Sequence, residues 1–247
     1  MIKTFALSAL LLMASSTAVA EPTRVMVRGL ALDAKFIGDS MGGVEVTLTD
    51  PKGRVLAQGL AKGGTGDTGR IMKAPHTRGG SLTDPATSGF EALLDLDHPT
   101  LVTATARGPL GKPASATTVT SQMWVVPGRN VTGDGWILTF PGLVIEPRIE
   151  AAANGEVKLQ AHVSLMCGCP IEPGGLWDAA RYDIEAQVIK GDRILSAVPL
   201  TYAGKTSEFA GQLTGVSPGR YRLRLVAKDR GSANAGVVEQ TLVVPKP

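Results

Sequence analysis

Residues 156–164 read EVKLQAHVS, and this stretch decides the fold because its apolar residues fall at every second position. Val157, Leu159, Ala161 and Val163 share one face of an extended chain, since successive side chains of a strand point to opposite sides. The other face carries polar side chains. A strand with one apolar face buries that face against another layer, so the stretch predicts one strand of a β-sandwich.

The same alternation recurs along the chain, and 30 glycines and 16 prolines supply turns between the alternating segments. Further strands are predicted at 23–30, 44–50, 54–59, 90–96, 100–106, 119–126, 131–136, 136–140, 182–190, 194–202, 207–213, 218–225 and 236–244. This is the composition of an all-β chain with many tight turns. We therefore predict an all-β fold of two antiparallel β-sandwich domains in tandem.

The N-terminus has the pattern of a secretory signal peptide, which we place at residues 1–20. Lys3 supplies the positive charge, residues 5–13 form a largely apolar run, and Ala18-Val19-Ala20 is a small-x-small cleavage site. The apolar run is too short for a stable membrane anchor. We expect the mature chain to have no membrane span and to be periplasmic or secreted.

The mature chain is long enough for two domains of ordinary size. We assign residues 21–145 to a first β-sandwich and residues 146–247 to a second, immunoglobulin-like one, with a connection at 141–148 between two proline-containing turns. A long, glycine-rich loop is predicted at 61–89. Loops of this length are uncommon in compact domains and often functional, so this loop is expected to face a partner or a substrate.

Two short segments resemble known sandwich modules. Residues 43–53 read GVEVTLTDPKG, which resembles the G-x-x-V-x-L-x-D-x-x-G hairpin of transthyretin-like, or carboxypeptidase-regulatory-like, sandwiches. Residues 218–225 read PGRYRLRL, and a tyrosine just after such a turn resembles immunoglobulin-like or fibronectin-like modules near their penultimate strand. The first resemblance implies a type of fold and carries no catalytic residues.

The charge balance indicates no nucleic-acid partner. The formal net charge is +3, and it falls by one when the leader with Lys3 is removed. No basic run with interleaved aromatic residues is present in the sequence. The expected partner is another exported or membrane-associated protein.

Residues 38–42 read GDSMG, which formally matches the G-x-S-x-G nucleophile elbow of hydrolases. That motif needs a strand, a sharp turn and then a helix. Here residues 44–50 alternate as a strand directly afterwards, so a glycine-rich turn is favoured over a nucleophile.

The chemistry of the chain is expected around its only two cysteines, Cys167 and Cys169, which flank Gly168. Thiolate and thioether ligands favour Cu(I), and imidazole suits copper and zinc. Cys167, Cys169, Met166 and His162 are therefore candidate ligands of a soft metal such as Cu(I). On a strand, His162 shares a face with Met166 and not with Cys167, so Met166 and His162 are conditional members of the set.

Two other interpretations of the cysteine pair remain open. The first is redox chemistry through a Cys-Gly-Cys disulfide, which requires a bend because Cα atoms two residues apart on a strand are too distant. The thioredoxin-like context of such pairs is missing. The second is a local disulfide that pins the following loop without activity. Trp177 and Asp178, in that loop, are expected to anchor it or to contact a partner.

The function favoured by these features is an exported, non-enzymatic accessory or binding protein, with the enzyme class left open. It would bind a soft metal such as Cu(I) through the Met-Cys-Gly-Cys segment and present the metal, or its loops, to a partner. The alternatives are a thiol–disulfide redox protein acting through Cys167 and Cys169, and a structural interaction module with a local disulfide. The motif is expected on an open loop at the mouth of the second sandwich.

Overall fold

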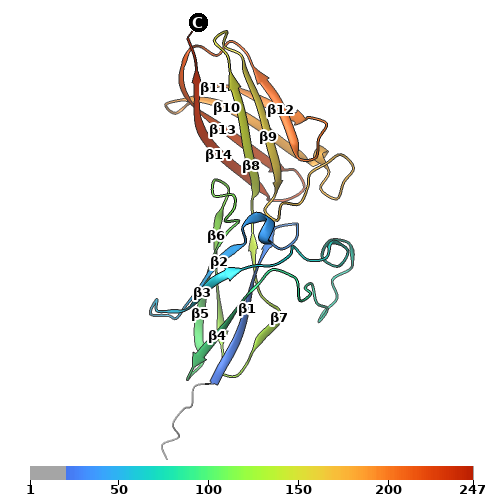
Figure 1. The fold of residues 1–247 in the computed structure, drawn as a ribbon, viewed down its shortest axis with the longest axis vertical. Coiled ribbons are helices and arrows are strands. Elements are labelled where there is room, and N and C mark those ends of the chain that lie inside the picture. Colours follow the sequence, from blue (N-terminus) through green and yellow to red (C-terminus); the bar gives the residue numbers. More distant parts are fainter. Residues whose placement is uncertain (1–20, 247) are drawn as a thin grey trace, which may run out of the picture.

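The computed structural model describes residues 21–246, and strands dominate it (Figure 1). The expected leader at 1–20 lies outside the described residues. Two stacks of strands follow one another along the long axis of the molecule. The prediction of an all-β fold with two sandwiches is confirmed. Among the described residues, no helix combines the length and the apolar character needed to cross a membrane.

The first sandwich packs a three-stranded sheet of order β4-β1-β7 against a four-stranded sheet of order β3-β2-β5-β6. Its strands are β1 (Glu21–Ala31), β2 (Val44–Thr49), β3 (Val55–Ala61), β4 (Phe90–Leu96), β5 (Thr100–Gly108), β6 (Thr117–Val125) and β7 (Val131–Phe140). The pairs are antiparallel except β1 with β7. β5 shows why the two sheets pack together, because Val102, Ala104 and Ala106 are buried on one face and the residues between them are not.

The second sandwich is one sheet of order β14-β13-β10-β11-β12-β9-β8 that folds over on itself. Its strands are β8 (Leu143–Ala151), β9 (Val157–Leu165), β10 (Tyr182–Lys190), β11 (Arg193–Tyr202), β12 (Glu208–Leu213), β13 (Gly219–Asp229) and β14 (Ala235–Val244). β11 pairs with β10 up to Leu200 and with β12 at Thr201 and Tyr202. This change of partner moves the chain from one layer to the other and brings β8 beside β14.

Tyr221 gives the second sandwich its immunoglobulin-like signature. Its hydroxyl donates a hydrogen bond of 2.8 Å to the carbonyl oxygen of Ser217. A buried tyrosine at the start of the penultimate strand that bonds back to the preceding backbone is the tyrosine corner of immunoglobulin-like sandwiches. The resemblance seen in the sequence at this residue therefore extends to its hydrogen bond.

The connection between the sandwiches is shorter than the sequence predicted. Only Pro141 and Gly142 separate β7 from β8, whereas a connection over 141–148 was expected. β8 begins at Leu143, and its first three residues are all buried. They start inside the contact between the two sandwiches, so both faces of the strand are covered there. The alternation that marks a half-buried strand is consequently missing, and the sequence pattern hid the start of the strand.

The long segment between β3 and β4 is more ordered than an irregular surface loop. It contains a short π-helical turn, Gly69–Lys73, and its two ends pair through isolated bridges. Arg28 of β1, which is 6% exposed, donates to the carbonyl oxygens of Thr87 and Ser88. A second anchor, Asp134 of β7, holds the middle of the segment.

The Asp134 carboxylate gathers donors from the turn at residues 81–83. It accepts hydrogen bonds from the Ser81 and Thr83 hydroxyls at 2.6 and 2.7 Å and from the Leu82 amide at 2.9 Å. Burial opposes its ionisation, but these bonds outweigh the burial and lower the pKa of Asp134 to about 2. A lowered carboxyl pKa means that the stabilisation is complete above the ordinary value of 3.8 and is lost as the pH falls toward 2.

Replacing Asp134 with asparagine is expected to loosen this turn at neutral pH. Hydrogen bonds to a charged group contribute about 1.5–3 kcal/mol, so amide hydrogen exchange at Leu82 and Thr83 should accelerate by roughly tenfold or more. The matched control is Asp95→Asn at an exposed strand position, which should leave these amides unchanged. Equal exchange rates in wild type and Asp134→Asn would show that the carboxylate does not hold the turn.

Candidate functional site

The Cys-Gly-Cys segment forms a tight turn at the end of β9. The Gly168 amide donates to the Leu165 carbonyl at 2.8 Å, and the Leu165 amide donates to the Cys169 carbonyl at 3.3 Å. Gly168 has a φ of +75°, which is the left-handed region that glycine adopts without strain. The turn brings the Cα atoms of Cys167 and Cys169 to 5.4 Å, and the two residues form a disulfide. The bend in the chain that a Cys-Gly-Cys disulfide requires is thus present.

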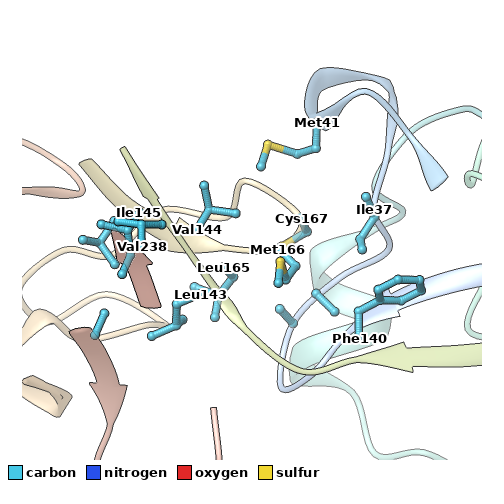
Figure 2. Close-up of a cluster of buried hydrophobic side chains, with 14 of the residues drawn as sticks. Ile37, Met41, Phe140, Leu143, Val144, Ile145, Leu165, Met166, Cys167 and Val238 are labelled. Atoms are coloured by element: carbon cyan, nitrogen blue, oxygen red, sulfur yellow. The ribbon is translucent and has the colours of Figure 1, made fainter. Parts of the chain in front are cut away.

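The disulfide lies at the junction of the two sandwiches, and this differs from the open loop that the sequence suggested. Cys167 and Cys169 are only 2% and 4% exposed. Figure 2 shows Cys167 within a buried cluster that joins Met166 of the second sandwich to Ile37 and Phe140 of the first. Packing between the domains covers the motif, which strand alternation within one domain cannot reveal.

Met41 is a soft donor that the sequence analysis did not single out. It ends a short 3-10 helix, Asp39–Met41, in the first sandwich and is buried. A Cβ atom placed on Gly168 would lie 2.8 Å from the Met41 sulfur, so the thioether rests on the cysteine turn. Met166 packs its terminal methyl against Gly142, in the link between the sandwiches. The only sequence signal for Met41 was its place in the GDSMG turn.

Ser40 shares that 3-10 helix and is exposed. The chain continues into β2, and no helix follows the turn as a nucleophile elbow requires. The interpretation of GDSMG as a glycine-rich turn is confirmed.

His162 lies apart from the cysteine turn, on the outer face of β9. Its Nδ1 atom is 3.2 Å from the Glu208 carboxylate of the paired strand β12, and Glu208 also forms an ion pair with Arg148. Met166 instead lies past the end of β9 and is 1% exposed. The structure therefore does not bring the two conditional ligands together. In residues 21–246, no group of three or more His, Cys, Asp or Glu side chains is arranged to hold a metal.

Trp177 and Asp178 organise the loop that follows the disulfide. The Trp177 indole donates a 2.8 Å hydrogen bond to the Asp33 carbonyl of the first sandwich, and the ring is 5% exposed. Asp178 caps a short 3-10 helix by accepting from the Ala180 amide at 3.0 Å. That bond and a second one from the Gly174 amide lower the pKa of the Asp178 carboxyl. Trp177 ties the loop to the first domain, and Asp178 shapes it locally.

Polar contacts also cross the junction. Asn234, which is 1% exposed, accepts from the Gly142 amide at 2.6 Å and donates to the Leu32 carbonyl at 3.0 Å. Lys112 of the first sandwich forms a 2.7 Å ion pair with Glu146 of β8. These contacts, together with the shared apolar cluster, fix the orientation of one sandwich on the other.

A pocket of about 430 Å³ opens beside the disulfide. Both sandwiches contribute to it, and the 61–89 segment forms one wall. Its lining comprises Lys35, Ser40, Thr65, Thr68, Lys73, Cys167, Gly168, Cys169, Pro170, Glu172, Leu176 and Trp177. Two features that were separate in the sequence, the long loop and the cysteine motif, thus share one cavity. Lys35 and Lys73 were not recognised as site residues, because only the tertiary fold brings them to the cysteines.

Comparison with known proteins adds little to this geometry. No family model matches the chain, and no curated protein matches it. Among solved structures, the selenomethionine-substituted chicken interferon gamma receptor alpha chain is similar over 92% of this chain and 100% of its own length. The sequence identity is 12% and the TM-score is 0.36. A likeness at that level establishes no function for this chain.

Proposed function

We propose that this chain is an exported accessory protein that binds a soft metal ion of the Cu(I) type at its sandwich junction once the disulfide is reduced. The observation that carries the proposal is the Met41 thioether resting on the Cys167-Gly168-Cys169 turn. Reduction would give two thiolates beside a thioether, all in a nearly buried position. Soft donors of this kind select Cu(I) over harder ions.

The donor set differs from the one that the sequence suggested. Met41 joins Cys167 and Cys169 as a donor. Met166 stays a candidate because it directly precedes Cys167 and lies in the same buried cluster. His162 leaves the set because its ring contacts Glu208 on the outer face of the sheet. Two thiolates and one or two thioethers fit a monovalent soft ion, since such sites need few ligands and no imidazole.

Export and an exported or membrane-associated protein partner remain part of the proposal. A disulfide formed by the only two cysteines suits a periplasmic or secreted protein, because oxidising compartments preserve such bonds. The 61–89 segment lies next to the junction pocket and offers a surface for a partner that would receive the metal. A role for this segment in docking is supported by its length and position.

Metal titration tests the proposal directly. Reduced mature protein, without oxygen, is expected to hold close to one Cu(I) per chain against a competing chelator, and Cys167→Ser/Cys169→Ser should lose it. Met41→Leu, a swap that conserves volume, should weaken binding by about tenfold or more. Met123→Leu, a methionine of β6, is the matched control and should bind normally.

His162→Gln tests the composition of the donor set in the same titration, because the proposed set does not include the imidazole. It should retain wild-type affinity. Equal Cu(I) retention by wild type and the double cysteine variant would refute the proposal.

A structural role for the disulfide is the second candidate, and the near-complete burial of both cysteines favours it. In that case the bond would only fix the turn against Met41 and the first sandwich. Cys167→Ser/Cys169→Ser would then lower the stability of the junction but leave partner binding and cellular function intact. The effect of the double cysteine variant on partner binding and cellular function, together with the Cu(I) titration, therefore distinguishes metal binding from a purely structural disulfide.

A further inference from the structure

The disulfide is nearly buried and borders a pocket at the junction of the two sandwiches. Cys167 and Cys169 are nearly buried, yet both line the 430 Å³ cavity at the junction. Thiol–disulfide exchange requires an incoming thiolate to approach one sulfur atom along the S–S axis. A folded oxidoreductase presents its thiol on a broad surface, whereas Cys167 and Cys169 expose only 2% and 4% of their surface. A small molecule fits the cavity.

The charged side chains that line the pocket carry a net positive charge. Lys35 and Lys73 contribute two positive charges, and Glu172 contributes one negative charge. Lys35 is held near the 61–89 segment, with its ammonium group 3.4 Å from the Gly66 carbonyl oxygen. The Glu172 carboxylate accepts a 3.2 Å hydrogen bond from the Thr206 hydroxyl. The hydroxyls of Ser40, Thr65 and Thr68 add donors that an anionic group can use.

We infer that this pocket admits small anionic thiols, which reduce the Cys167–Cys169 disulfide in preference to protein thiols and to neutral or cationic small thiols. The thiolate attacks one cysteine sulfur, the S–S bond breaks, and the other cysteine leaves as a thiolate that takes a proton from water. A second thiolate attacks the mixed disulfide, which yields the protein dithiol and the oxidised small thiol. The lysines attract the anion and favour its thiolate form.

The experiment compares three small thiols of different charge on the mature protein without metal. These are 2-mercaptoethanesulfonate, 2-mercaptoethanol and cysteamine, at equal thiolate concentration and low salt. Alkylation and mass spectrometry follow the loss of the disulfide. An oxidised peptide with the sequence of residues 165–170 supplies the intrinsic reactivity of each thiol. The ratio of anionic to cationic rates should be about tenfold higher for the protein than for the peptide, and high salt should reduce it.

Lysine variants test whether the pocket charges cause the preference for the anionic thiol. Lys35→Gln/Lys73→Gln should bring the rate ratio down to that of the peptide. Lys52→Gln/Lys158→Gln removes two exposed lysines outside the pocket and should leave the ratio as in wild type. A thioredoxin-class protein should reduce the disulfide more slowly than the anionic thiol at equal thiolate concentration.

The inference is overturned if the protein and the peptide give the same rate ratio, if the pocket variant keeps the wild-type ratio, or if the protein reductant is the faster one. It does not depend on metal binding, because the rates are measured without metal. A charge-selective reduction with no Cu(I) retention would therefore reject the proposed function and keep this inference.

Discussion

Trp177→Ala is expected to lower the free energy of unfolding by about 3–5 kcal/mol, the range found when a buried aromatic side chain is truncated to alanine. The ring is 5% exposed and fills space between the disulfide loop and the first sandwich. Its indole also donates the 2.8 Å hydrogen bond to the Asp33 carbonyl, so the variant leaves that oxygen without this partner. Denaturant unfolding followed by circular dichroism measures the change.

Two further variants separate the parts of this effect. Trp177→Phe retains most of the ring and loses the N–H group. Its loss of stability should therefore be about 1–2 kcal/mol smaller than that of Trp177→Ala. Trp124→Ala is the matched control, because Trp124 is 65% exposed on β6 and should change stability by no more than about 0.5 kcal/mol. Similar losses for Trp177→Ala and Trp124→Ala would contradict the role of Trp177 as the anchor of the junction.

Asp229→Ala is expected to cost about 3 kcal/mol, the lower end of the range for breaking a buried ion pair. The Asp229 side chain is 1% exposed and accepts from Arg181 at 2.9 Å, from the Gly231 amide at 2.8 Å and from the Ser232 hydroxyl at 2.9 Å. The lower end applies because Arg181 is 41% exposed and water can solvate it after the change. Arg181 also approaches Asp33 at 3.6 Å, so the loss extends to the junction.

The loss of stability caused by Asp229→Ala should depend on pH. Burial opposes ionisation of Asp229, but the bonds from Gly231, Ser232 and Arg181 outweigh it and lower the pKa of the carboxyl. The contribution of Asp229 to stability is therefore complete above its ordinary pKa of 3.8 and is lost as the pH falls through the lower folded value. The stability gap between wild type and Asp229→Ala should narrow as the pH falls below about 4.

The matched control for Asp229 is Asp183→Ala. Asp183 is 51% exposed and pairs with Arg230 at 3.3 Å, an arrangement that contributes no more than about 1 kcal/mol. Equal costs for the two variants, or a stability gap for Asp229→Ala that is the same at pH 3 and pH 7, would show that burial does not set the strength of the Asp229 network.

The strands were predictable because each depends on local alternation. The predicted strands at 90–96 and 182–190 coincide with β4 and β10, since both bury one face and expose the other. The start of β8 was missed because the junction covers both of its faces. The order of the 61–89 segment was missed as well, since it depends on Arg28 and Asp134, which lie on β1 and β7.

The candidate site was predictable only in part. Cys167 and Cys169 were recognised from their spacing, and the reach of the chain implied that a disulfide between them would need a bend. Strand parity separated His162 from the cysteines, and its contact with Glu208 on the outer face agrees. Met41 could not be found in the same way, because it lies more than one hundred residues earlier and no local pattern links it to the turn.

By itself, the sequence determined the all-β class, the places of most strands and the immunoglobulin-like resemblance at Tyr221, because these features depend on neighbours within a few residues. The tertiary structure alone decided that the disulfide is buried between two sandwiches and that it shares a pocket with Lys35 and Lys73. Packing between distant segments sets burial and charge environment, and those two quantities govern which metal, thiol or partner can reach the cysteines.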